Sequence, residues 1–302
     1  MPPPLSTQGC SKTFDVTERR RTIRIRRSAL LEAKMQEIDR PSIKIAETLE
    51  EYLQAFTILH NVYRASGYLA QPHPSGMLLT RHHLLPGCCV FLFKSYLDVL
   101  STMSFIPDTP LFGLPMDDLY HDKIEALRNQ GRKVAEIASL ATLRHHCGQN
   151  IMVFLSKAIF QYALLTNTDD LCIMVNPKHV RFYQSIFLFE PFGEVRHFDK
   201  VNAPAVALRV DMRSIEPNLR EAYAAQEFDT DLHHFFVKIN SHMIDQNTIF
   251  TQIEKNAPLE SEIARTLLKA HPELLDNVTE DQHDYLTTLY HKALFATSRL
   301  PR

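Results

Sequence analysis

The chain has 302 residues, of which 45% are hydrophobic and 23% are charged, and its formal net charge is -2. This composition is that of an ordinary folded protein, and the length fits about two domains, or one domain with a long extension. A net charge near zero argues against nucleic-acid binding, because displacing counterions from a polyanion requires a large excess of basic residues.

Cysteine usage and the short apolar segments favour a cytoplasmic protein. The five cysteines form no CxxC pair and are odd in number, which predicts reduced thiols rather than a disulfide framework. The two most apolar stretches, 84–93 and 151–165, are too short, or interrupted by Lys157, to be the roughly 20-residue apolar segment that crosses a bilayer. We therefore expect no integral membrane segment, and the first residues lack the pattern of an export signal.

Residues 1–40 predict a flexible basic arm. Six arginines lie between Arg19 and Arg27, after a start rich in proline, serine and threonine. Such a run either docks an acidic partner or a polyanion, or is a solvated tail. The sequence leaves both interpretations open.

Residues 41–212 predict a mixed α/β domain. A Thr48–Glu51 capping box starts its first helix, and Gly67 stands where a left-handed residue would end it. The expected strands, from their alternating or continuous apolar patterns, are 42–46, 88–94, 99–106, 133–142, 171–175 and 203–212. The further expected helices are 117–130, 151–165 and 178–187. This order predicts one sheet that combines an antiparallel hairpin with helix-linked parallel strands, with helices on both faces.

Two other segments complete the organisation. The loop over 71–87 is long and apolar, which is typical of a segment that covers something. Residues 213–302 carry fourteen acidic and nine basic residues and predict helices broken at Pro258 and Pro272. This helical C-terminal extension is either a second domain, or a lid and dimerisation element.

Several classes of chemistry are disfavoured by missing motifs. Only eight glycines are spread along the chain, and neither a P-loop nor a GxGxxG motif is present, which argues against nucleotide-dependent enzymes. The adjacent pairs His82–His83 and His145–His146 lack the spacing of metal ligands, so we expect no metal and no cofactor. No GxSxG motif exists, and Cys88 and Cys89 stand in an apolar strand, where thiols usually act as small hydrophobes.

What remains is an acid-bearing strand followed by a polar loop and a buried helix. Glu136 is in the strand, and residues 144–150 form the loop with a single glycine, Gly148. The amino terminus of the following helix offers backbone N–H groups and a positive dipole end to an anionic or carbonyl-bearing ligand.

This succession resembles the acyl-donor core of the GCN5-related N-acetyltransferase (GNAT) superfamily. The strings PSGMLLTRHHLLPG, PDTPLFGLPMDDLY, RKVAEIASLAT, NPKHVRFY and VNAPAVALRVD more specifically resemble the long-chain N-acyl amino acid synthases, the environmental-DNA acyltyrosine synthase group. The match covers roughly residues 42–212. The resemblance implies an acyltransferase that moves a long-chain fatty acyl group from an acyl carrier protein thioester to the α-amine of an amino acid.

The resemblance also implies roles for individual residues. Glu136 would be the base that deprotonates the α-amine, and Tyr183, at the position of the superfamily's acid tyrosine, would protonate the leaving thiolate. The remaining expected binding residues for substrate or acyl donor are His83, Ser139, Leu140, Arg144, Gly148, Asn176, His179 and Arg181. Backbone N–H groups where the Glu136 strand parts from its neighbour would hold the oxyanion.

Each role competes with a plainer interpretation. Glu136 could pair with Arg132 or Lys133, Tyr183 could be a core residue bonded to a backbone acceptor, and His83 could face solvent. Asn176 could bond a backbone group, while His179 and Arg181 could merely solvate a helix start. Regular alternation puts Glu136 and Ser139 on opposite faces of the strand, so a shared role requires a β-bulge between them.

The sequence departs from related patterns at three places. Acyl-homoserine lactone synthases read E-x-S-R at the acid-bearing strand, whereas this chain has Ala138 and Ser139 at the last two positions, which weakens a lactone-synthase interpretation. The loop HHCGQN lacks most of the superfamily's pyrophosphate motif, which suits a carrier-protein donor better than coenzyme A. Leu188 stands where the group usually has glycine.

Two alternatives to the amino acid synthase stay open. One is a catalytically silent acyl-binding or interaction protein built on the same fold; the enzyme interpretation would fail in its favour if an arginine sealed Glu136 and no channel reached it. The other is an enzyme that makes a homoserine lactone. A basic face for an acidic carrier protein is expected from Arg144, Lys178 and Arg181, together with the arm.

Overall fold

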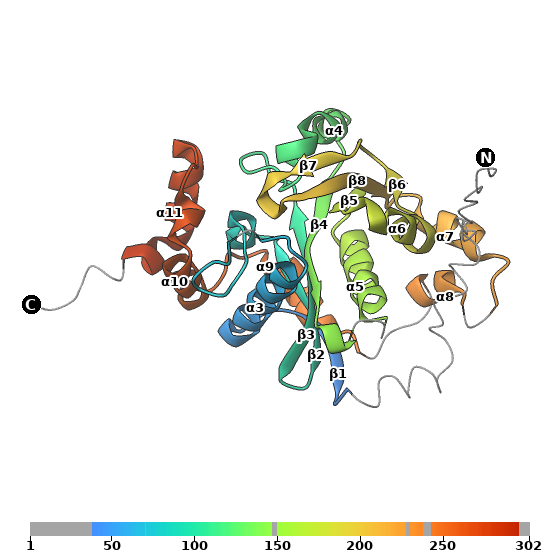
Figure 1. The fold of residues 1–302 in the computed structure, drawn as a ribbon, viewed down its shortest axis with the longest axis horizontal. Helices are drawn as coiled ribbons and strands as arrows, with labels where there is room; N and C mark the ends of the chain where they lie inside the picture. Colours follow the sequence, from blue (N-terminus) through green and yellow to red (C-terminus); the bar gives the residue numbers. More distant parts are fainter. Residues whose placement is uncertain (1–37, 70, 147–149, 228–229, 238–242, 296–302) are drawn as a thin grey trace, which may run out of the picture.

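The computed structural model describes residues 38–69, 71–146, 150–227, 230–237 and 243–295 (Figure 1). The predicted arm lies outside the described residues except for its last three positions. The strands are β1 Pro41–Ile45, β2 Cys89–Ser95, β3 Asp98–Pro107, β4 Val134–Thr142, β5 Asp170–Val175, β6 Glu190–Pro191, β7 Arg196–Phe198 and β8 Ala203–Asp211. The α-helices are α3 Leu49–Ala65, α4 Asp117–Asn129, α5 Ile151–Leu165, α6 Val180–Phe187, α7 Ile215–Tyr223, α8 Leu232–Val237, α9 Gln246–Lys255, α10 Ser261–Ala270 and α11 Glu280–Phe295. Short 3-10 helices are η1 Arg81–Leu84, η2 Arg144–His146, η3 Pro177–His179, η4 Asp199–Val201 and η5 Pro272–Leu275.

Eight strands form one mixed sheet in the order β1-β2-β3-β4-β5-β8-β6, with β7 paired to β8. The hairpin of β2 and β3 is antiparallel, as predicted, and β4 and β5 run parallel, joined by α5. β8 is antiparallel to β5 rather than parallel. The reason is that β6 and β7, which the sequence analysis took as loop, follow α6 and turn the chain back before β8 begins.

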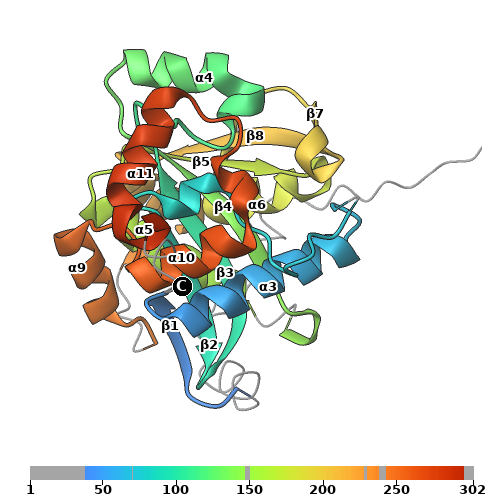
Figure 2. The ribbon, with the colours of Figure 1, turned by 90° about the vertical axis from the view of Figure 1, so that its left-hand side faces the viewer.

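Helices cover both faces of this sheet. On one face, α5 to α8 share a hydrophobic core with the inward side chains of β2 to β5 and β8. On the other face, α3, α10 and α11 pack over β2 and β3, and α4 packs over β4 (Figures 1 and 2). The mixed α/β fold with helices on both faces and a helical C-terminal extension is therefore confirmed.

Local signals set the boundaries of α3. The Thr48 hydroxyl accepts a hydrogen bond from the Glu51 backbone N–H, and the Glu51 carboxylate accepts one from the Thr48 N–H in return. At the other end, Gly67 adopts a φ of +76°, the left-handed conformation in which glycine has no steric penalty. Both predicted helix boundaries are confirmed.

The C-terminal extension wraps around the sheet. After α7 and α8, which lie on the α5 face, residues 243–245 pair with the free side of β1: the Ile43 N–H donates to the Met243 carbonyl and the Asp245 N–H to the Ile43 carbonyl. The chain then reaches the opposite face, where the Tyr290 hydroxyl donates to the Leu84 carbonyl at 2.5 Å. The last helices thus share a core with α3 and the loop before β2.

Candidate active site

The two parallel strands in the middle of the sheet part from each other half-way along. β4 pairs with β5 from Val134–Asp170 to Ile137–Ile173. Beyond that point β4 continues beside β3 to Thr142, and β5 continues beside β8 to Val175. The diverging strand ends leave backbone groups that no longer pair across the gap, which is the kind of place where a carbonyl oxygen can be bound.

A β-bulge in β4 lies at this gap. Thr102 pairs with Ala141 and Ser104 with Ala138, so two residues of β4 stand opposite Met103 alone. Ser139 takes up the extra length with a φ of +55°. Its side chain thereby turns to the face that carries Glu136. The bulge that a shared role would require is present.

Glu136 is held on the α4 side of β4. Its side chain is 2% exposed, and its carboxylate accepts a 2.7 Å hydrogen bond from the backbone N–H of Met116, at the start of α4. Burial raises the pKa of this carboxyl to about 8, which the Met116 hydrogen bond only partly offsets. Nearby Asp117 and Asp118 add to the increase. A carboxyl with this pKa exchanges its proton near neutral pH.

The plain alternative for Glu136, an ion pair with Arg132, is wrong. Arg132 instead pairs with Asp170, and its guanidinium lies 2.9 Å from Asp211. These two acids lie on β5 and β8, at the end of the sheet from which β4 starts. Among the described residues, no arginine forms an ion pair with the Glu136 carboxylate.

His83 is a second buried polar residue on the same face. It is 2% exposed, so the solvent-facing alternative is wrong. Its Nδ1 lies 3.0 Å from the Thr80 nitrogen, while its Nε2 lies 3.2 Å from the Ser104 hydroxyl and 3.4 Å from the Ser139 hydroxyl. Burial lowers the pKa of His83 to about 4, which keeps the ring neutral at neutral pH. The imidazole therefore connects the loop over residues 71–87, the covering loop, to β3 and to the bulge.

Tyr183 lies on α6 and is buried. Its hydroxyl donates to the sulfur of Met152, in the first turn of α5, at 3.8 Å rather than to a backbone acceptor. Burial, and then the neighbouring Tyr63 phenol, raise its pKa, so the hydroxyl holds its proton at neutral pH. Thioether sulfur is a weak acceptor, and the proton stays available for transfer.

Tyr63, at the end of α3, joins these groups. Burial, then Tyr68 and Glu136, raise its pKa to about 12, and it in turn raises the pKa of Tyr183. Tyr63, Ser104 and Met116 are not among the residues predicted for the site. Residue type gave no signal for these three, because only the packing of α3, β3 and α4 onto β4 brings them to the site.

The remaining predicted residues lie around the gap. Leu140 packs into the α5-side core, and the Asn176 side chain accepts a hydrogen bond from the Lys178 N–H, as its plain alternative holds. Arg144, His179 and Arg181 are exposed in η2, η3 and α6. Gly148 lies outside the described residues.

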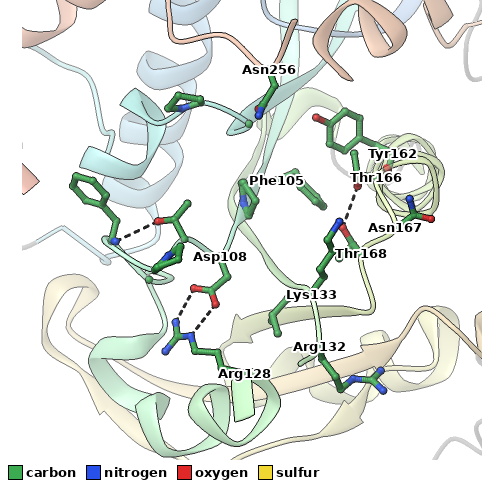
Figure 3. A pocket seen from close by; sticks show the side chains of 18 of the residues that line it. Phe105, Asp108, Arg128, Arg132, Lys133, Tyr162, Thr166, Asn167, Thr168 and Asn256 are labelled. Carbon is green, nitrogen blue, oxygen red and sulfur yellow. Dashed lines mark hydrogen bonds and ion pairs between the residues drawn. The ribbon is translucent and has the colours of Figure 1, made fainter. Parts of the chain in front are cut away.

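A pocket of about 1080 Å³ opens elsewhere, at the end of the sheet where β4 begins (Figure 3). Phe105, Arg128, Lys133, Tyr162 and Asn256 are among its lining residues. Neither Glu136 nor Tyr183 lines it. The buried polar groups of the candidate site therefore lie apart from this pocket.

The parted parallel strands, the bulge and the helices on both faces define a GNAT-type acyltransferase. The family model of the N-acyl amino acid synthase FeeM matches residues 54–211, slightly more than half of the chain. The chain belongs to this FeeM family. No curated protein matches it.

Several solved structures are similar to this chain. FeeM, an N-acyl amino acid synthase from uncultured soil microbes, is 28% identical, has a TM-score of 0.53, and covers 59% of this chain and 95% of its own. BjaI, a CoA-dependent acyl-homoserine lactone synthase, is 14% identical and has a TM-score of 0.48. The match covers 71% of this chain and 99% of BjaI. An N-acetyltransferase from Staphylococcus aureus Mu50 is 13% identical and has a TM-score of 0.38. The match covers 57% of this chain and 98% of the acetyltransferase. In the described ranges no helix has both the length and the apolar composition to cross a membrane.

Proposed function

We propose that this acyltransferase makes long-chain N-acyl amino acids, taking the acyl group from an acyl carrier protein thioester. The observation that carries the proposal is the buried Glu136 carboxyl beside the bulge and the gap, with a pKa of about 8. An α-amine is mostly protonated at neutral pH, with a pKa of about 8 even when it is lowered in a peptide, so a nearby base is needed to take its proton.

The reaction balances with the residues of the site. Glu136 takes a proton from the α-ammonium group, and the free amine attacks the thioester carbonyl. Backbone N–H groups at the gap stabilise the oxyanion. Collapse of the tetrahedral intermediate breaks the carbon–sulfur bond, and Tyr183 protonates the thiolate. The second amine proton and the proton held by Glu136 then leave to the bulk, and Tyr183 regains its own proton from solvent.

Two features support the donor. Apolar residues of the α5-side core, among them Ile137, Leu140, Ile173 and Val175, border the gap and suit a fatty acyl chain. Arg144 follows β4, whereas Lys178 and Arg181 follow β5, and all three are exposed. Because β4 and β5 are parallel, these cations stand at one end of the sheet, where an acidic carrier protein would dock.

The donor is tested by comparing acyl carrier protein and coenzyme A thioesters of the same fatty acid. We expect higher kcat/KM with the carrier protein, and a decrease of roughly tenfold for the triple variant Arg144→Glu, Lys178→Glu, Arg181→Glu with that donor only. The control variant carries the same number of charge reversals at exposed sites elsewhere, Arg220→Glu, Lys255→Glu and Lys269→Glu. Equal use of both donors, with no effect of either variant, would overturn the carrier-protein donor.

A further inference from the structure

A cluster of two histidines and one glutamate lies outside the candidate active site. His73 belongs to the covering loop, whereas His271 lies between α10 and η5, and Glu273 lies in η5. Their ligand atoms lie within 4.8 Å of one another. The cluster therefore joins two segments that are about 200 residues apart in the sequence.

The two imidazole rings share both of their polar neighbours. His271 Nδ1 lies 2.7 Å and His73 Nε2 lies 3.3 Å from the same carboxylate oxygen, Oε1 of Glu273. The other nitrogen of each ring lies 2.7 Å from the Ser75 hydroxyl. Ser75 thus holds the outer nitrogen of both rings, as groups around metal-binding histidines do. Its backbone N–H also donates to His73 Nδ1 at 3.2 Å, so the proton of the neutral His73 ring lies on Nε2 and is displaced when an ion binds there.

A third histidine next to the cluster has an unsatisfied nitrogen. His60 on α3 is 3% exposed, and its Nε2 has no hydrogen-bond partner among the described residues. A buried polar atom without a partner is costly, and a bound water or ion would satisfy it.

We propose that His73, His271 and Glu273 bind a divalent transition-metal ion of the zinc type, which clamps the C-terminal extension onto the covering loop. Two imidazoles and one carboxylate form a known zinc ligand set, with a fourth position for water. The rings stack at 4.0 Å, tilted by 21°, so the His73 ring turns out of the stack when it binds the ion. Its side chain is 31% exposed, which leaves room for that movement.

The covering loop connects the proposed metal site to the candidate active site. The Met77 N–H donates to the Ser75 hydroxyl at 3.1 Å, and the chain runs from there to Thr80 and His83. Arg81 in the same loop donates to the carbonyl oxygens of Asp276 and Asn277. An ion at this place would hold the loop on the extension without touching Glu136.

The test is metal binding by the full-length protein, freed of metal with a chelator, measured by titration calorimetry with Zn²⁺ and by the absorption spectrum with Co²⁺. We expect one tight site, a Co²⁺ spectrum of nitrogen and oxygen ligands, and a melting temperature that rises with Zn²⁺. His73→Gln and Glu273→Gln, at partly exposed positions, should weaken binding about tenfold or more. His283→Gln, at an exposed position of α11, should leave it unchanged.

Three results would overturn the proposal. They are no saturable binding, binding that persists unchanged in both cluster variants, and a thiolate band in the Co²⁺ spectrum, which would place the ion on a cysteine. None of these measurements uses catalysis, so they stand apart from the test of the acyl donor.

Discussion

The Glu136 carboxylate accepts a 2.7 Å hydrogen bond from the Met116 backbone N–H, and α4 begins at this contact. The bond fixes the direction of the carboxylate without supplying a full counter-charge. Burial therefore dominates, and the pKa of Glu136 rises to about 8. A buried carboxyl that ionises near neutral pH is suited to proton transfer.

The activity is expected to rise with pH up to about 8. Only the ionised form of Glu136 is a base, so kcat/KM should fall as the pH decreases from 8 to 6. His83 has its pKa lowered to about 4 and adds no step in that range. The test is to measure kcat/KM for the amino acid from pH 6 to 9 with a saturating donor. A kcat/KM that does not change with pH would argue against Glu136 as the base.

The same pKa makes a prediction about stability. The folded state binds the Glu136 proton more tightly than the unfolded state, whose pKa is close to the ordinary 4.5, so stability falls as pH rises from about 4.5 to about 8. The contribution is at most about 1.4 kcal/mol per pH unit. Glu136→Gln keeps an oxygen for the Met116 N–H and removes the titration. Urea unfolding at pH 6 and pH 8 should show the variant gaining stability relative to wild type. An equal pH dependence of both proteins would contradict this.

The bulge can be separated from the hydroxyl of Ser139. Ser139→Gly suits the φ of +55° but has no hydroxyl, whereas Ser139→Thr keeps the hydroxyl and adds a β-branched side chain that disfavours this conformation by about 1–2 kcal/mol. If the backbone geometry at the gap is what matters, glycine keeps most of the activity and threonine lowers it. The reverse order would assign the role to the hydroxyl.

Tyr183→Phe tests the proton donor. Loss of an acid is expected to reduce kcat about 10²-fold with an alkyl thioester, whose thiolate leaves poorly without a proton. With an aryl thioester the thiolate leaves unprotonated, and the variant should approach the wild-type rate. Stability should change little, because among the residues that the structure describes the hydroxyl bonds only the Met152 sulfur. A uniform loss with both donors would indicate a packing role.

The last helix is expected to unfold together with the sheet. The buried Tyr290 hydroxyl donates to the Leu84 carbonyl and accepts from the Leu259 N–H, so Tyr290→Phe leaves two backbone groups without this partner and should cost about 1–3 kcal/mol. Urea unfolding should remain a single transition at lower denaturant concentration. Two separate transitions would show that α10 and α11 form an independent unit.

The sequence contains the local elements of this fold but not its long-range contacts. The Thr48–Glu51 box, Gly67 and the strand patterns act through near neighbours and could be predicted. β6 has two residues and β7 has three, which is too few for a periodic pattern. The chain reversal that makes β8 antiparallel to β5 could therefore not be predicted from the sequence.

The candidate site divides in the same way. Glu136 and Tyr183 were identified through motif resemblance, and the bulge followed from the alternation of β4. The Met116 contact and the position of Tyr63 depend on how α4 and α3 pack onto the sheet. The proposed metal cluster joins residues 73 and 271, which are far apart in the sequence and share no local pattern.

The central claim is that Glu136 serves as the base of an amino acid N-acylation. Its most direct test is mass spectrometry of lipids from cells that express the wild-type chain, Glu136→Gln, or the exposed control Glu190→Gln. We expect N-acyl amino acids with wild type and the control, and at least a 10²-fold decrease with Glu136→Gln. Equal amounts of product from Glu136→Gln and wild type would contradict the role of Glu136. Absence of product from the folded wild-type protein would contradict the proposed synthase activity.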